Sequence, residues 1–387
     1  MKILHTSDWH LGHSLYNYDR SAEQLDMLEQ IITIVAEEQP DVMLICGDVY
    51  HTSQPSAAVQ TMFAEAMVKM HTACPDIMIV VTAGNHDSGS KHEIFRTPWR
   101  ALGVYAIGNI DKEHPESHII DINGKGWVLA VPYCHERNLP EGFFLKLTEM
   151  ASELNTEDKP IVLTAHTTVK GCDITGHDTA SEYSVGGIDY YEIDDMGSGY
   201  DYLALGHIHH AQFVHGGHHR VRYSGTPIAV SFDETYSHSV SIVEIQSHGD
   251  IPEVRQVEIT NPKPLVTLPA IGAASWDEAK KLLKDFPSDI EAYIRLKVAT
   301  ENFLPAEANA EAYALTEGKR CHFCLISTIR NTPNASNAKI LTVAELQKES
   351  PIDIARNFAE YQGVAFDEDM EALFAEALQM VEEEKRG

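Results

Sequence analysis

Five short segments of this sequence carry side chains that could bind metal ions or move protons. In each one, aspartate, asparagine or histidine directly follows an apolar run typical of a strand. The segments are Asp8-Trp9-His10, Gly47-Asp48, Gly84-Asn85-His86-Asp87, His166 and Gly206-His207-Ile208-His209. The two polar residues of the first segment, and the two histidines of the last, are two positions apart, so on an extended backbone each pair would point the same way. The glycines that begin three of the segments suit turns where the backbone must come close to a crowded site.

The residue types indicate the kind of ion. Carboxylate, imidazole and amide oxygen without thiolate favour borderline or hard divalent metals such as Mn²⁺, Fe²⁺ or Zn²⁺. One catalytic ion needs open coordination positions, so seven candidate ligands suit two ions that share a bridging carboxylate better than one. The candidates are Asp8, His10, Asp48, Asn85, His166, His207 and His209. Two ions about 4 Å apart can activate water and stabilise the charge that develops in phosphoester hydrolysis. His86, adjacent to a candidate ligand, is then free to donate a proton or stabilise charge.

Strands that alternate with helices must position these segments. The apolar patterns predict helices over residues 22–38 and 57–70, with Leu25, Leu28 and Ile31 on the apolar face of the first. They predict strands over residues 2–6, 41–46, 77–82, 127–132, 161–164 and 202–205, and a strand-rich stretch over 221–224, 240–245 and 254–259. The ends of strands in such a fold form the usual ligand crevice. We therefore predict an α/β fold with a large, two-layered sheet.

The rest of the chain predicts a smaller α+β unit and a helical tail. Asn261-Pro-Lys-Pro264 has the composition of a linker, and we expect domains over residues 1–260, 261–345 and 346–387. The smaller unit would contain a helix over 276–286 and strands over 291–298 and 322–330. In the acidic tail, apolar residues recur at helical spacing: Met370, Leu373, Phe374, Ala377, Leu378 and Val381. This stripe either packs on its own domain or docks on another protein.

Composition excludes several classes of protein. The 387 residues suit about two to three domains and are 43% hydrophobic, which is enough for a sizeable core. The apolar runs are too short for a membrane span, and polar residues begin too early for a secretion signal, so we expect a cytoplasmic protein. The net charge of −29 opposes nucleic-acid binding, because phosphate contacts need a basic surface.

The remaining cysteines and histidines predict little chemistry. Cys321 and Cys324 have the spacing of a metal or redox pair, but no second pair completes a zinc site. We favour two reduced cysteines in a strand. Four further histidines exceed the needs of two ions, and we expect them at the surface: His210, His215, His218 and His219.

The five segments together resemble the calcineurin-like metallophosphoesterase superfamily. Gly47-Asp48-Val49-Tyr50-His51 carries histidine where the protein phosphatases of this superfamily have aspartate followed by arginine, and that histidine is typical of its DNA double-strand-break nuclease branch. Tyr223-Ser224-Gly225-Thr226-Pro227 and Ser231-Phe232-Asp233-Glu234 are similar to the SbcD family of bacterial nuclease subunits. The resemblance spans the chain from Asp8 to about residue 240.

The resemblance implies roles for individual residues. Asp8, His10, Asp48 and His209 would hold one ion, and Asp48, Asn85, His166 and His207 the other, with Asp48 bridging. His86 would assist the leaving oxygen, and His51 would contact or orient the phosphate. The fold implied is two sheets flanked by helices, with a small α+β capping domain and a helical tail.

The resemblance also implies an activity and partners. It implies 3′-to-5′ exonuclease action on duplex ends and endonuclease action on hairpins or single strands, supported by Mn²⁺ and serving DNA repair and recombination. An SbcC-type, SMC-like ATPase would receive the tail through Leu373, Phe374, Leu378 and Val381. Helices near residues 56–70 and 92–102 would form a two-fold homodimer interface.

The acidic charge leaves DNA binding as the open question. DNA contacts could come from Tyr16, Asn17 and Arg20, or from Lys280, Lys281 and Lys284, although each is as well explained as a solvated surface residue. A small-substrate phosphodiesterase or phosphatase would accommodate the acidity more easily, but it leaves the small domain, the tail and His51 unexplained. A metal-stabilised binding scaffold is a third interpretation, and the complete ligand set with an available His86 argues against it.

Overall fold

The computed structural model describes residues 1–94, 96–176, 190–300 and 303–330, together with residues 350, 352–353, 355–356, 359, 366–367, 370–374 and 378. The chain divides into two compact units. The larger holds Met1–Val266, Asp289–Ile294 and Arg320–Cys324, and the smaller holds the other described residues. Strands β18 (Tyr293–Thr300) and β19 (His322–Arg330) therefore begin in the larger unit and continue in the smaller one.

Two six-stranded sheets form the larger unit. The first has the order β16-β15-β1-β4-β5-β6 and contains β1 (Lys2–Thr6), β4 (Val42–Cys46), β5 (Met78–Thr82), β6 (Val104–Ile107), β15 (Ser239–Glu244) and β16 (Glu253–Glu258). The second has the order β13-β14-β12-β9-β8-β7 and contains β7 (Ile119–Asp121), β8 (Trp127–Ala130), β9 (Ile161–His166), β12 (Tyr202–Gly206), β13 (Gln212–Phe213) and β14 (Val221–Tyr223). The central strands of each sheet are parallel, so their carboxyl ends meet at one edge.

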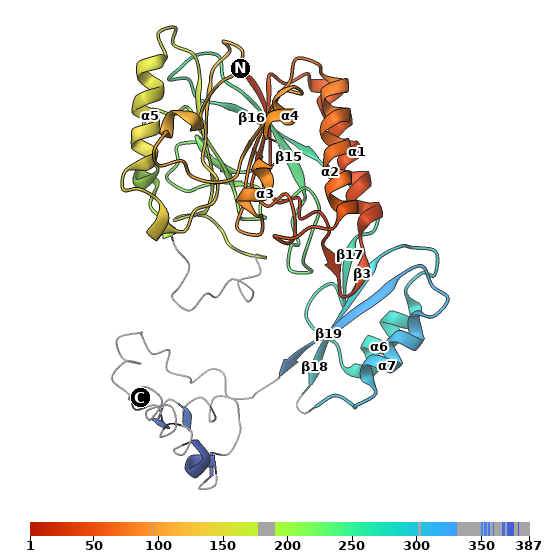
Figure 1. Ribbon diagram of the computed structural model, residues 1–387. Coiled ribbons are helices and arrows are strands. Elements are labelled where there is room, and N and C mark those ends of the chain that lie inside the picture. Colours follow the sequence, from red (N-terminus) through yellow and green to blue (C-terminus); the bar gives the residue numbers. More distant parts are fainter. Residues whose placement is uncertain are drawn as a thin grey trace. The chain divides into compact units, whose positions relative to one another are not determined.

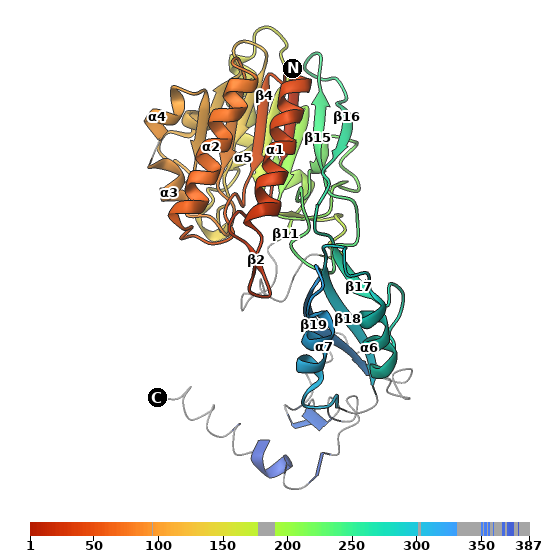
Figure 2. The ribbon, with the colours of Figure 1, turned by 90° about the vertical axis from the view of Figure 1, so that its right-hand side faces the viewer.

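Three apolar cores stack these sheets between helices. One core joins the first sheet to α1 (Ser21–Glu38) and α2 (Ala57–Ala73), and a second joins the other sheet to α5 (Phe143–Leu154). The third lies between the sheets and contains Leu44 and Val80 from one and Val162 from the other. Figure 1 and Figure 2 show this layering of helix, sheet, sheet and helix. The predicted two-layered α/β sandwich is confirmed.

Shorter elements complete both units. They are β2 (Ser14–Leu15), β3 (Tyr18–Asp19), α3 (Gly89–Glu93), α4 (Arg96–Arg100), β10 (Thr168–Val169), β11 (Tyr190–Tyr191), and 3₁₀ turns at Pro115–His118, Glu136–Asn138 and Ile193–Met196. A three-stranded sheet of order β17-β18-β19 accompanies β17 (Leu265–Leu268), α6 (Trp276–Asp285) and α7 (Ala308–Thr316). A capping box starts α6: the Ser275 hydroxyl accepts from the Glu278 amide, and the Glu278 carboxylate accepts from the Ser275 amide.

Two helix predictions need correction. Leu25 is 45% exposed, while Glu23 and Gln24 lie on the buried face of α1 and form hydrogen bonds there. The helix expected near residues 92–102 is divided into α3 and α4. Pro98 has no amide hydrogen to donate to the carbonyl four residues earlier, so one continuous helix would lack that bond. In the described part of the chain, no helix has both the length and the apolar character needed to cross a membrane.

Candidate metal centre

The loop after β1 and the loop after β4 run side by side and carry the first predicted ligands. The Asp8 amide donates to the Gly47 carbonyl, and the His10 amide donates to the Asp48 carbonyl, each at 3.0 Å. The backbone is left-handed at Asp8 (φ 55°), His10 (φ 45°), Asp48 (φ 50°) and His207 (φ 97°). These residues therefore converge through tight loops, and the extended backbone expected for Asp8 and His10 is absent.

The three glycines that precede predicted ligands stand where no side chain fits. A Cβ atom on Gly47 would lie 2.1 Å from the His166 Nδ1, and one on Gly84 would lie 2.1 Å from the Asp48 Oδ1. A Cβ atom on Gly206 would lie 1.9 Å from the Cys46 carbonyl oxygen. The expected close approach of backbone to a crowded site is confirmed at all three.

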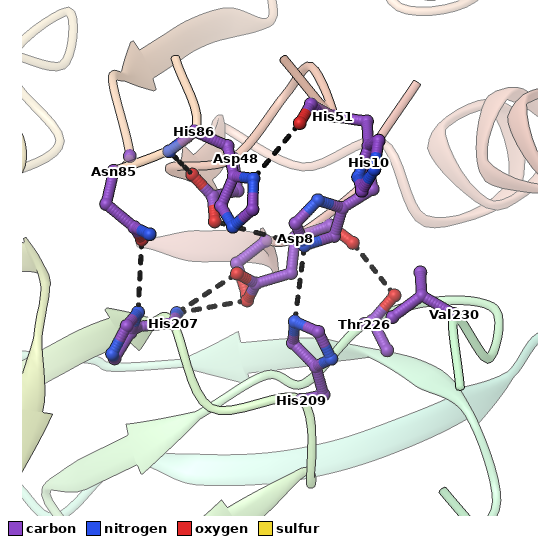
Figure 3. Close-up of polar contacts among 12 residues, drawn as sticks. Asp8, His10, Asp48, His51, Asn85, His86, His207, His209, Thr226 and Val230 are labelled. Carbon is purple, nitrogen blue, oxygen red and sulfur yellow. Dashed lines mark hydrogen bonds and ion pairs between the residues drawn. The ribbon is translucent and has the colours of Figure 1, made fainter. Parts of the chain in front are cut away.

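Asp8, His10 and His209 form the first cluster. One ligand atom from each lies within 4.8 Å of the other two. The Nε2 atoms of His10 and His209 face each other at 3.2 Å, as Figure 3 shows. On its other side, His209 Nδ1 lies 3.1 Å from the buried Glu234 carboxylate, which fixes the ring and leaves Nε2 toward the cluster.

Asp48 and His166 form a second cluster that also includes Asp8. His166 Nε2 lies 3.4 Å from Asp48 Oδ2 and 2.9 Å from Asn85 Oδ1. His166 Nδ1 donates to the Cys46 carbonyl at 2.8 Å, which leaves Nε2 as the ligand atom. His207 Nδ1 lies 3.2 Å from the same Asn85 oxygen. All seven predicted ligands are thus gathered at one edge of the two sheets.

Electrostatics favour a cation at this place. Burial raises the pKa of Asp8, whose side chain is fully enclosed. Burial also opposes ionisation of Asp48, but His166, His10 and His86 together hold the pKa of Asp48 below its ordinary value. Burial would lower the pKa of His166, yet Asp48 and Asp8 raise it to about 10. Buried carboxylates that draw a proton onto a neighbouring imidazole are a fitting donor set for a divalent ion, which would supply that positive charge.

His86 and His51 lie beside the ligands. The His86 amide donates to Asp48 Oδ1 at 2.9 Å, and its Nδ1 lies 3.0 Å from the His51 carbonyl oxygen. The two rings stack with centroids 5.7 Å apart, and His86 is 5.0 Å from the ring of His10. With Nδ1 turned to the carbonyl, Nε2 is the His86 atom that could reach a reacting group.

Comparison with known proteins identifies the family. Residues 1–211 match the family model described as calcineurin-like phosphoesterase. The chain is 31% identical to the SbcD subunit of nuclease SbcCD from Bacillus subtilis, over 99% of each chain. It is 30% identical to the same subunit from Rhodobacter capsulatus, over 72% of this chain and 74% of the relative, and 27% identical to the one from Escherichia coli, over 85% and 86%.

The chain belongs to the SbcD family of calcineurin-like phosphoesterases. It is therefore a metal-dependent phosphodiesterase of the nuclease type. Divalent metal ions are implied by the family, and the clustered aspartates and histidines fit them.

Sequence reasoning missed three supports of this SbcD-family site. Asp87 accepts the amide hydrogens of Val49 (3.1 Å), Tyr50 (2.9 Å) and Gly84 (2.9 Å), and so ties two ligand-bearing loops together. Glu234 orients His209, a role that its motif did not reveal. His13 packs against His51 with centroids 4.7 Å apart. Asp87 directly follows the predicted motif, which was the available signal; nothing local marks the other two.

The predicted DNA contacts have different surroundings. Tyr16 is 47% exposed and Asn17 is exposed, so a ligand could reach both. Arg20 is only 1% exposed, and the expected DNA contact by its guanidinium is wrong in this structure because internal groups hold it. Lys280 pairs with Asp277 and Glu311, which reduces its use for phosphate, whereas Lys281 and Lys284 are exposed.

Several other predictions fall at the periphery. Cys321 and Cys324 are buried and free, and they belong to no metal cluster among the described residues. Three of the extra histidines are not at the protein's buried centre, and His210 stacks on Tyr236. In the tail, Leu373 is 67% exposed, Phe374 and Leu378 are half-buried, and Val381 lies outside the described residues.

Proposed function

We propose that this chain is the nuclease subunit of a bacterial SbcCD-type complex, cutting DNA with two Mn²⁺ ions. The reactions would be 3′-to-5′ exonuclease action on duplex ends and endonuclease action on hairpins and single strands. The observation that carries the proposal is the buried gathering of seven oxygen and nitrogen ligands, with His86 bound to Asp48 at its border. The shared name of the relatives supports DNA as the substrate.

The ligands divide between two ions in this proposal. Asp8, His10, Asp48 and His209 would hold one ion, and Asp48, Asn85, His166 and His207 the other. Asp48 Oδ2 lies within 4 Å of His10 and His166, which supports its bridging role. When bound, the ions would supply an activated water and positive charge opposite the phosphate oxygens.

His86 and His51 would act on the substrate itself. The His51 carbonyl can only accept a hydrogen, so His86 Nδ1 donates to it and Nε2 faces the reaction. A protonated His86 would then pass the Nε2 hydrogen to the leaving oxygen, or hold it there as charge develops. The neighbouring His51 ring would orient the phosphate.

Partners would use surfaces away from this centre. An SbcC-type ATPase would take the tail helix through Leu373, Phe374, Leu378 and Val381, and the exposure of Leu373 supports this. A second copy would pack against α2, α3 and α4, where Val68 is 48% and Ile94 is 65% exposed. The smaller unit, with its boundaries at 261–345, would act as the capping domain over DNA.

The deciding experiment is digestion of end-labelled blunt duplex DNA by the purified chain with Mn²⁺. Wild type, His86→Ala and the exposed control His219→Ala are compared. Metal-dependent shortening by wild type and His219→Ala, but not by His86→Ala, is expected. Full activity of His86→Ala would contradict the catalytic assignment. If no protein cuts alone, the assay is repeated with the ATPase, and inactivity there too refutes the nuclease proposal.

The net charge of −29 favours a second candidate, a phosphodiesterase for small substrates. The two are separated by comparing initial rates on DNA and on bis(4-nitrophenyl) phosphate. Faster turnover of DNA per active site is expected for the nuclease. For the tail, no change in ATPase binding after Leu373→Asp with Phe374→Asp would refute the docking role.

A further inference from the structure

Arg20 is a fully buried cation directly before α1, and its contacts are internal. Nη1 donates to the Ala229 carbonyl at 2.7 Å and lies 3.4 Å from His13 Nδ1. Nε lies 3.8 Å from the Glu23 carboxylate, three residues along the chain. Within the described residues, Nε and Nη2 have no hydrogen-bond partner. A buried guanidinium that is incompletely satisfied is costly to fold, so its presence calls for a role.

One side of Arg20 leads toward the metal centre. A guanidinium only donates, so the Nδ1 of His13 facing it must accept, and the hydrogen of a neutral His13 ring is on Nε2. The His13 ring then packs edge-on against His51 with centroids 4.7 Å apart. His51 packs against His10 and His86 on its other sides. Its buried Nδ1 has no hydrogen-bond partner among the described residues, so packing fixes the ring.

The other side of Arg20 is anchored at the start of β18. The Glu23 carboxylate accepts the Tyr293 hydroxyl hydrogen at 2.7 Å, and Arg20 lies over the Tyr293 ring at 5.8 Å. Tyr293 is completely buried. The Tyr18 ring lies 5.8 Å from it, and the Tyr18 hydroxyl donates to the Phe323 carbonyl. Arg20 is therefore held from behind by a buried, hydrogen-bonded pair.

We propose that Arg20 is a positioning residue for the nuclease reaction, which fixes the His13 ring and through it the ring of His51. The inference rests on the proposed function, in which His51 orients the phosphate. The polar contacts of Arg20 go to Ala229, His13 and Glu23 rather than to metal ligands, so its loss should disturb phosphate placement while the ions still bind. A misplaced orienting group lowers turnover more than affinity.

The test compares Arg20→Met and Arg20→Lys with wild type on DNA at saturating Mn²⁺. Arg20→Met should lower kcat by about ten- to a hundred-fold with little change in KM. Arg20→Lys, which keeps a donor, should recover part of it. Mn²⁺ stoichiometry and melting temperature are measured on each protein. The control is Arg255→Met, which removes an exposed ion pair with Glu38 and should leave kcat unchanged.

A double-mutant cycle with His51→Ala separates positioning from general damage. If Arg20 acts through His51, adding Arg20→Met to His51→Ala should lower kcat by no more than about two-fold. An equal loss in both backgrounds would overturn the proposal, as would wild-type kcat in Arg20→Met. Should Arg20→Met not fold, Glu23→Gln takes its place, with the same expectation in both backgrounds. Each comparison is repeated on bis(4-nitrophenyl) phosphate: wild type inactive on DNA but active there refutes the nuclease proposal alone, and inactivity on both refutes both.

Discussion

Asp48 is the side chain that touches most of the metal centre. Its Oδ2 lies near His166 and His10, and its Oδ1 accepts the His86 amide hydrogen. A single carboxylate thus borders both ligand clusters and the proposed catalytic histidine. Its charge matters more than its shape.

Replacing Asp48 by Asn keeps the shape and removes the charge. We expect fewer than two Mn²⁺ ions to bind and kcat to fall by on the order of 10²-fold or more, because the shared anionic ligand is lost. Isothermal titration with Mn²⁺ and the DNA assay measure this. Asp76→Asn, at an exposed carboxylate, is the matched control. Two ions bound with wild-type affinity in Asp48→Asn would exclude the bridging role.

His5 predicts a pH dependence of stability. It lies in β1, fully buried, with Nδ1 2.9 Å from the Tyr202 hydroxyl and Nε2 3.2 Å from the Leu205 carbonyl. Burial, with a smaller contribution from Arg222, lowers the pKa of His5 to about 3. Below pH 6.5 the unfolded chain binds a proton that the folded chain refuses, so the free energy of unfolding falls as the pH falls toward 3.

The expected slope is about 1.4 kcal/mol per pH unit for this one group. Between about pH 6.5 and 5 the wild type should therefore lose about 2 kcal/mol more stability than His5→Gln, which cannot titrate. Urea denaturation at the two pH values measures both proteins. Parallel losses would show that His5 is not the responsible group.

The sequence predicted the ligands but not their supports. Asp8, Asp48 and His166 follow strand-like runs, and that local signal led to the cluster that the structure contains. Arg20 and Glu234 gave no such signal, because burial of a charged residue depends on partners far along the chain: Ala229 for Arg20, and His209 for Glu234. Residue type alone therefore placed Arg20 at the surface.

At the scale of elements, the turn after β4 is a tightly packed part of the centre. Gly47 has φ 87°, and a Cβ there would meet the His166 ring, which is a predicted ligand. Gly124 is also left-handed, at φ 71°, but it has open space around it. The two glycines separate backbone strain from steric conflict.

We expect Gly124→Ala to cost roughly 1 kcal/mol of stability, from the backbone alone, with normal Mn²⁺ binding. Gly47→Ala should cost more and should also weaken Mn²⁺ binding, because the methyl group would displace His166. Thermal unfolding with and without Mn²⁺ measures both. Equal effects of the two substitutions would show that the His166 ring moves aside without consequence.

Strand prediction succeeded where burial is continuous. The runs that became β1, β4, β5 and β9 are wholly or almost wholly buried, and their predicted bounds differ by at most two residues at either end. Two-residue strands such as β10 and β13 could not be predicted, since a partner distant in sequence defines each of them. The face of α1 was misjudged for the same reason: Glu23 is buried because Tyr293 receives it.

The charge of the whole molecule limits its grip on DNA. With 58 acidic and 29 basic residues, the chain has few cations to offer phosphate, and Arg20 and Lys280 are already paired. We expect weak binding by the isolated chain that falls about ten-fold from 50 to 200 mM salt, as for about two phosphate contacts. Fluorescence anisotropy with His86→Ala, which should bind DNA without cutting it, measures this. Tight binding that persists at high salt would contradict this expectation.

The left-handed backbone at Asp8, His10, Asp48 and His207 sets activity against stability in the molecule as a whole. Each such residue costs on the order of 1 kcal/mol, which glycine would not incur. Selection for thermal stability of the metal-free chain alone should therefore enrich glycine at these four positions and abolish cleavage. Their persistence as aspartate and histidine would then record continued selection for catalysis, and a lineage freed from that demand should lose them early.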